Sequence, residues 1–103
     1  ITSRDAVYAV DAATGNNKWT TNPNLVFGSS LALSPDGLTL YAGAYDKRLH
    51  AFDAATGSEL PWAFKTGADV YSSPTPSEDG RAVYLGSADD KLYAIAAPAA
   101  AAA

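Results

Sequence analysis

The sequence contains no cysteine and a single histidine. The segment therefore cannot form a disulfide, bind a metal through thiolates or use a cysteine nucleophile. Its seven lysine and arginine residues are scattered and the net charge is −4, so no basic patch is present for a phosphate backbone or an anionic lipid surface. No apolar run approaches the roughly 20 residues of a membrane-spanning helix. We therefore expect neither nucleic-acid binding nor membrane insertion.

The chain also lacks an initiator methionine, and a strand pattern begins almost at once in "ITSRDAVYAV". We interpret the 103 residues as an excerpt from a longer polypeptide. Much of the 48% hydrophobic fraction is alanine, which has little apolar area to bury. The last residues, 97–103, are an Ala-rich tail of uncertain identity.

A repeat of about 43 residues runs through the chain. "VYAVDAATG" at 7–15 matches "LHAFDAATG" at 49–57, and "SSLALSPDGLTLYAG" at 29–43 matches "SSPTPSEDGRAVYLG" at 72–86. Periods of this length are typical of propeller blades or of helical arrays. Short apolar runs separated by Asp-Gly and other glycine turns favour strands over helices.

One complete unit contains four predicted strands, at 29–33, 38–43, 48–53 and 59–65. Four antiparallel strands per repeat form one blade of a β-propeller. The sequence therefore predicts an all-β fold, a partial β-propeller of nine strands and a little over two blades. Its parts are the last two strands of a blade at 1–23, a complete blade at 24–66 and the first three strands of a further blade at 67–96.

The ring of a propeller needs at least four blades, so this piece presents two uncovered blade faces. We expect these faces to meet further blades of the same chain or of other copies.

The two copies of the D-A-A-T-G stretch, each followed by a tryptophan, resemble the tryptophan-docking motif of quinoprotein (PQQ-dependent) dehydrogenase-like propellers. Pro61 adds one residue before the second tryptophan. The likeness covers about residues 4–95. The residues that carry it are Ala9, Asp11, Thr14, Gly15 and Trp19 in the first copy and Ala51, Asp53, Thr56, Gly57 and Trp62 in the second.

The resemblance implies that these motifs dock neighbouring blades. Trp19 would stack between Ala9 and the Thr56–Gly57 peptide of the next blade, and its indole N–H would reach the carbonyl of Ala54. Asp11 and Asp53 would accept hydrogen bonds from N–H groups of their own turns.

The third copy departs from the motif. Ala96 replaces the expected aspartate, and Ala99 and Ala100 stand in place of Thr-Gly. Trp62 would therefore lack its proper receiver. Either the last blade is degenerate or the alanines stand in for residues of unknown identity.

The remaining polar residues give little sign of chemistry. The acidic residues of the hairpins lack the order of an EF-hand loop, so we expect solvated turns and an almost silent Asp46→Ala substitution. His50 aligns with Tyr8 and Tyr93, which favours a packing or surface role over catalysis. No G-x-S-x-G elbow surrounds the serine pairs that begin the inner strands at 29–30 and 72–73. Tyr45, at a hairpin tip, is the candidate rim contact.

Three functions follow from these interpretations. The leading one is a non-catalytic PQQ-like propeller segment that acts as a protein–protein interaction scaffold or a sensor domain, with no catalytic residue, metal or cofactor in this segment. One alternative is a fragment of a PQQ- and calcium-dependent alcohol or sugar dehydrogenase. The other is a structural subunit of an oligomer or fibre completed through open blade faces. The resemblance favours a periplasmic or extracellular location.

Overall fold

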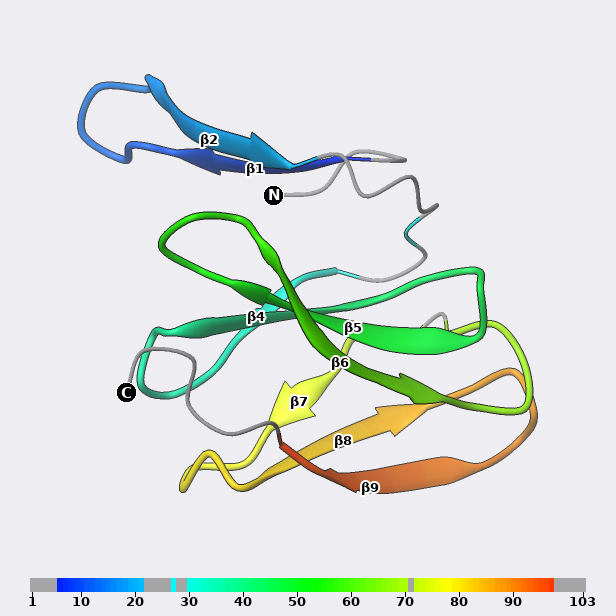
Figure 1. Ribbon diagram of the computed structural model, residues 1–103. Helices are drawn as coiled ribbons and strands as arrows, with labels where there is room; N and C mark the ends of the chain where they lie inside the picture. The colour runs from blue at the N-terminus through cyan, green and yellow to red at the C-terminus, as the bar shows by residue number, and fades with distance from the viewer. Residues whose placement is uncertain (1–5, 22–26, 28–29, 71, 98–103) are drawn as a thin grey trace.

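The computed structural model describes residues 6–21, 27, 30–70 and 72–97. These residues form nine strands and no helix, in three antiparallel sheets that lie one above another (Figure 1). The predicted all-β fold class is confirmed. The sheets are β1 (Val7–Val10) with β2 (Asn17–Thr21); β3 (Ala32–Leu33), β4 (Thr39–Gly43), β5 (Arg48–Asp53) and β6 (Glu59–Lys65); and β7 (Thr75–Pro76), β8 (Ala82–Gly86) and β9 (Leu92–Ala96).

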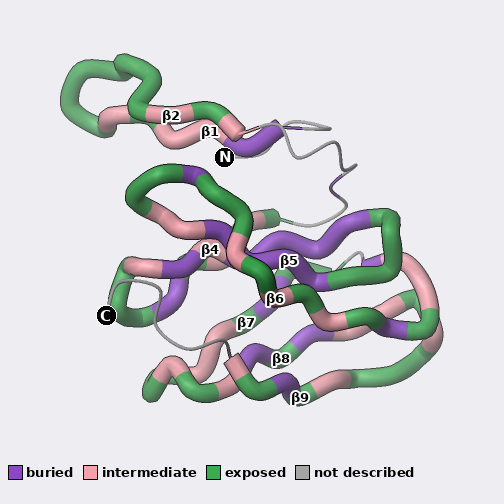
Figure 2. The backbone as a smooth tube through the Cα atoms, viewed as in Figure 1, coloured by how far each residue is buried: buried purple, intermediate pink, exposed green. Residues whose placement is uncertain are grey.

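The middle sheet buries residues on both of its faces because successive side chains of a strand point to opposite sides. In β5, Leu49 and Ala51 join a cluster with the third sheet, whereas Phe52 joins a cluster with the first sheet. We call the contact between the first and middle sheets the first interface, and that between the middle and third sheets the second interface. Figure 2 shows buried residues running along the middle sheet between its two neighbours.

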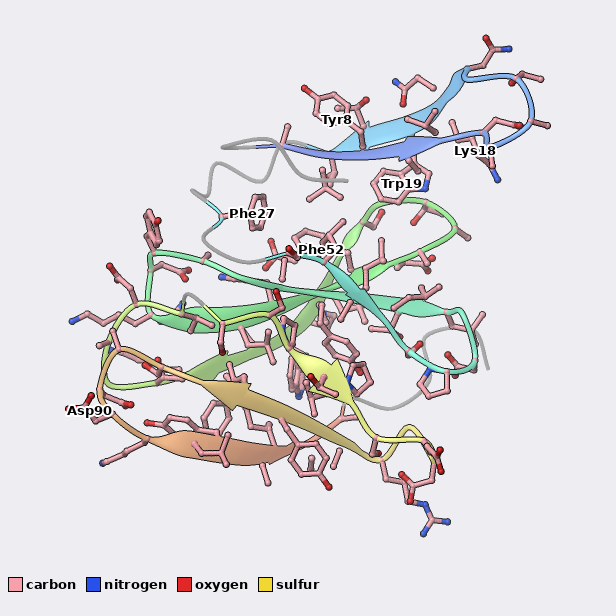
Figure 3. All side chains as sticks on the ribbon, turned by 180° about the vertical axis from the view of Figure 1, so that it is seen from behind. Tyr8, Lys18, Trp19, Phe27, Phe52 and Asp90 are labelled. Atoms are coloured by element: carbon pink, nitrogen blue, oxygen red, sulfur yellow. The ribbon has the colours of Figure 1, made fainter. Side chains whose placement is uncertain are left out.

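The first interface is built around aromatic side chains. Phe27 and Phe52 meet edge to face with ring centroids 6.1 Å apart, and Val7 of β1 is fully buried beside them (Figure 3). The second interface is aliphatic on its third-sheet side, where Val83, Leu85 and Ile95 are buried. Apolar burial of this kind is the dominant stabilising contribution.

The innermost strand of the middle sheet is shorter than predicted. Of the range 29–33, only Ala32 and Leu33 pair with β4, and residue 29 lies outside the described part of the chain. The backbone N–H of Ser30 donates instead to the Ser73 hydroxyl, 3.2 Å away. Because this donor is directed across the second interface, it does not extend the ladder with β4.

Pro61 is accommodated by an irregularity in the outer strand. The register of β5 and β6 shifts between His50 and Phe52, and β1 with β2 shows a smaller shift between Ala9 and Val10. Proline is tolerated in β6 because this is an edge strand, where a missing N–H leaves no ladder bond unmade.

Candidate functional site

Trp19 of β2 lies against the middle sheet (Figure 3). Its indole Nε1 donates to the carbonyl oxygen of Ala54 over 3.0 Å. Ala9, the partner of Trp19 across the β1–β2 ladder, is half-buried behind it. A buried indole gains stability from its large apolar area only if its single donor is satisfied, and the Ala54 carbonyl satisfies it.

Gly57 lies directly under the Trp19 ring. Its φ is +81°, and a Cβ at this position would come 2.5 Å from Cε3 of Trp19. Only glycine allows the indole to approach the backbone this closely and accepts the left-handed φ at little cost. Gly15 has nearly the same φ, +77°, but no atom within 4 Å of the equivalent point.

The two D-A-A-T-G turns share one hydrogen-bond pattern. The N–H of Gly15 donates to the carbonyl of Asp11, and the N–H of Gly57 donates to the carbonyl of Asp53, both over 2.8 Å. The Asp11 carboxylate accepts from the N–H groups of Ala13 (2.8 Å) and Thr14 (3.1 Å), which holds its pKa below the ordinary value of 3.8.

The second turn repeats these side-chain bonds. The Asp53 carboxylate accepts from the N–H of Ala55 over 2.8 Å. The Thr56 hydroxyl accepts from the next-but-one N–H over 3.3 Å, as the Thr14 hydroxyl does over 3.2 Å in the first turn. Both turns are therefore organised from within by aspartate and threonine side chains.

Trp62 packs in the second interface. Its ring meets Tyr41 edge to face with centroids 6.0 Å apart, and Ala97 packs against the same cluster. The Thr-Gly equivalents at 99 and 100, with the rest of the tail, lie outside the described residues. Tyr45, the candidate rim contact, follows β4 in the turn to β5 and is 47% exposed.

A charged cluster that the sequence did not predict surrounds His50. His50 is 4% exposed, and its ring Nδ1 lies 2.7 Å from Glu59 Oε2 while its ring Nε2 lies 2.8 Å from Asp46 Oδ2. Each ring nitrogen of His50 therefore has a carboxylate partner, one from the β4–β5 turn and one from β6. The expectation that Asp46 is merely solvated is wrong, because the β4–β5 turn carries its carboxylate back onto His50.

The third sheet contains a related pair. Tyr93, the equivalent of His50, donates its hydroxyl to Asp89, the equivalent of Asp46. Asp89 also accepts from the N–H of Gly67 over 2.9 Å, which ties the β8–β9 turn to the connection that follows β6. A carboxylate four residues before this strand position thus anchors the turn in both sheets. The sequence signal that could have predicted both contacts is an aspartate four residues before His50 and four residues before Tyr93.

The described residues contain no group of three or more histidine or acidic side chains placed to hold a metal ion. No helix in the described ranges has the length and apolar character needed to cross a membrane.

Comparison with known proteins places this chain in a family. Residues 3–101 match the family model described as "Outer membrane protein assembly factor BamB". The crystal structure of BamB from Moraxella catarrhalis is similar, with a TM-score of 0.77 and 20% sequence identity. The match covers 91% of this chain and 28% of that one, so this chain spans little more than a quarter of its length. Among curated proteins none matches. The chain, with its stacked antiparallel sheets and repeated turns, therefore belongs to the BamB family of PQQ-like repeat propellers.

Proposed function

We propose that this chain is a non-catalytic segment of a BamB-like propeller and serves as a scaffold for protein–protein contact. The observation that carries the proposal is how the hairpin aspartates are used. Each accepts a hydrogen bond from the backbone N–H two residues later, so each stabilises a turn. They are Asp11, Asp36, Asp46, Asp53, Asp79 and Asp89.

Turns that are held by their own hydrogen bonds present a rigid surface to a partner. A loop already ordered in the free protein loses less conformational entropy when a partner binds. Binding residues are often carried by loops on a rigid scaffold of this kind.

The docking of one blade against the next by Trp19 is part of the same proposal. The Ala54 hydrogen bond and the contact with Gly57 support a joining role for the first tryptophan motif. Trp62 packs in the second interface beside Tyr41, and the positions equivalent to its Thr-Gly receiver lie outside the described residues. In this view the docking residues stabilise the scaffold and the hairpin loops meet the partner.

The family description supplies the finer part of the proposal. Since the matching model describes an outer membrane protein assembly factor, we propose a partner from outer membrane protein assembly and a periplasmic location. Tyr45 is the proposed contact on this chain, because exposed tyrosines are enriched among residues that dominate binding energy.

Site-specific photo-crosslinking in cells tests this function. The change Tyr45→p-benzoylphenylalanine in the full protein is expected to give one adduct, identified by mass spectrometry as an outer membrane assembly protein. The matched control is Ala88→p-benzoylphenylalanine, at the exposed equivalent position of the β8–β9 turn. Removing metal ions with a chelator should leave the adduct unchanged. Equal adducts at both positions, or loss of the adduct on chelation, would contradict the proposal.

A further inference from the structure

A groove crosses the second interface where two hairpin turns meet. One turn joins β3 to β4 and the other joins β7 to β8. The groove has a volume of about 470 Å³. We call it the inter-blade groove and define it by Ser34, Asp36, Thr39, Tyr41, Glu78 and Asp79.

The polar rim of the inter-blade groove is acidic. Asp36, Glu78 and Asp79 line it, and none of the described residues along it is a lysine or an arginine. Hydrogen bonds from the hydroxyls of Ser34 and Ser77 hold the pKa values of Asp36 and Asp79, respectively, below 3.8. Both carboxyls are therefore ionised at neutral pH. The chain as a whole carries a net charge of −4, so the long-range field also attracts cations.

Part of this carboxylate surface has no hydrogen-bond partner among the described residues. The Oδ1 atoms of Asp36 and Asp79 accept the turn hydrogen bonds, while no described residue donates to either Oδ2. Glu78 likewise receives no hydrogen bond from the residues described, and its side chain is exposed. Arg81 lines the adjoining hollow on the outer face of the third sheet together with Glu78 and Asp79, and its charge also lowers the pKa of Asp79.

Tyr41 provides a second and independent sign of a ligand. The residue is only 2% exposed and lines the groove, yet its hydroxyl makes no hydrogen bond with any residue in the described ranges. Burial raises the pKa of this hydroxyl, and the negative charge of Asp36 raises it further. The described residues contain no fully buried side-chain nitrogen or oxygen that lacks a hydrogen-bond partner, so the Tyr41 hydroxyl keeps access to the groove, where a ligand can reach it.

The same side chains recur one repeat later. Ser77, Asp79 and Tyr84 take the places of Ser34, Asp36 and Tyr41, and they line a hollow of about 570 Å³. Tyr84 is 44% exposed, because no described sheet covers its face. The polar set is therefore a property of the repeat, and a neighbouring blade converts it into an enclosed groove.

We propose that the inter-blade groove binds the guanidinium group of an arginine side chain from a protein partner. This inference rests on the scaffold function proposed above. The described acidic residues are not placed to hold a metal ion together, and the volume suits a side chain rather than a bare ion. A guanidinium offers five N–H donors in a planar fork, enough for carboxylates on two walls and the Tyr41 hydroxyl.

Binding of a blocked, fluorescently labelled peptide, Gly-Ala-Arg-Ala-Gly, to the full protein tests the proposal. Fluorescence anisotropy should show binding that weakens with added salt. The citrulline peptide, which keeps the shape and lacks the charge, should bind about tenfold more weakly or worse. The lysine peptide should also bind more weakly, since its ammonium lacks the fork. Equal affinity for the citrulline or the lysine peptide would overturn the assignment.

Two variants locate the binding. Glu78→Gln removes one charge from an exposed position, and Tyr41→Phe removes only the hydroxyl; each should weaken binding of the arginine peptide about threefold to tenfold. Asp90→Asn, in the β8–β9 turn with φ of +68°, is the matched control and should leave the affinity unchanged (Figure 3). If Tyr41→Phe unfolds the protein, Glu78→Gln alone decides. Unchanged binding in Glu78→Gln would place the arginine elsewhere and overturn the proposal.

Crosslinking at Tyr45 separates this proposal from the scaffold function. If the adduct forms but the peptide does not bind, the groove assignment fails and the scaffold function stands. If the peptide binds with the expected variant pattern but no adduct forms, the scaffold function fails and the guanidinium site remains supported.

Discussion

Gly57 and Gly15 occupy equivalent positions in the two D-A-A-T-G turns, but different structural constraints act on them. Both have a left-handed φ, +81° and +77°, which the turn requires. Only Gly57 also faces a side chain, since the Trp19 ring lies where its Cβ would be. One sequence motif therefore combines a conformational requirement, shared by both copies, with a packing requirement that depends on the neighbouring sheet.

Paired substitutions separate these two requirements. Gly15→Ala should lower the free energy of unfolding by about 1–2 kcal/mol through the left-handed φ alone. Gly57→Ala should cost roughly 1–3 kcal/mol more, because the methyl group displaces Trp19. Urea denaturation measures both. In a protein that also carries Trp19→Ala, Gly57→Ala should cost no more unfolding free energy than Gly15→Ala. If the two glycine substitutions cost the same in the otherwise unchanged protein, the Trp19 contact contributes nothing to stability.

The contact between Asp46 and His50 was not predicted from the sequence. The Asp46 carboxylate reaches a histidine whose side chain is 5% exposed, while the Asp46 side chain itself is 31% exposed. We therefore expect Asp46→Ala to cost about 1–2 kcal/mol of unfolding free energy, since a buried ring nitrogen loses its partner. Glu78→Ala, at an exposed position with no described hydrogen bond, is the control and should stay within about 0.5 kcal/mol. Denaturation curves that coincide for the two variants would mean that the His50 cluster does not stabilise the fold.

At the scale of elements, strands flanked by strong turn signals were predictable. The predicted ranges 48–53 and 59–65 coincide with β5 and β6, because an Asp-x-x-Thr-Gly turn separates two apolar runs. The length of the inner strand at 29–33 was overestimated, since Ser30 directs its N–H to Ser73, in the segment that leads into β7 of the third sheet. Contacts between sheets are not encoded in the local pattern of either strand.

The bulge in β6 explains why the sequence did not predict the cluster around His50. Across β5 and β6, His50 pairs with Ala63 while Phe52 pairs with Glu59. In a regular ladder, Glu59 would not be placed opposite this part of β5. The register shift beside Pro61 brings its carboxylate within 2.7 Å of the His50 ring. Such shifts depend on tertiary packing and are poorly specified by residue type.

At the scale of the whole molecule, burial of a repeated position depends on the sheet beside it. Leu49 and Ala51 are fully buried in the second interface. Their equivalents 43 residues later, Leu92 and Ala94, are exposed, Leu92 by 82%. The outer face of the third sheet therefore repeats a surface that another sheet covers elsewhere in the same chain. This repetition is the physical basis for expecting further blades in the complete protein.

The hairpin turns of all three sheets also share one electrostatic property. Asp11, Asp36, Asp79 and Asp89 have pKa values below 3.8 in the folded chain. The leading causes are the N–H of Ala13 for Asp11 and, for the other three, hydroxyl donors from Ser34, Ser77 and Tyr93. Unfolding removes these donors and returns each carboxyl to its ordinary value.

The sign of the resulting pH dependence follows from proton linkage. A carboxyl whose pKa is lowered by folding binds more protons in the unfolded state, so it stabilises the fold above its ordinary pKa and loses that effect as the pH falls below it. We expect the urea midpoint to be constant near neutrality and to fall between about pH 5 and pH 2.

The double variant Asp36→Asn, Asp79→Asn is the matched comparison, because asparagine keeps the side-chain oxygen that accepts the turn N–H but cannot titrate. It should be less stable than the wild type at neutral pH and lose less stability on acidification, so that the two curves converge in acid. Two parallel curves would show that these turn carboxylates do not couple folding to protonation.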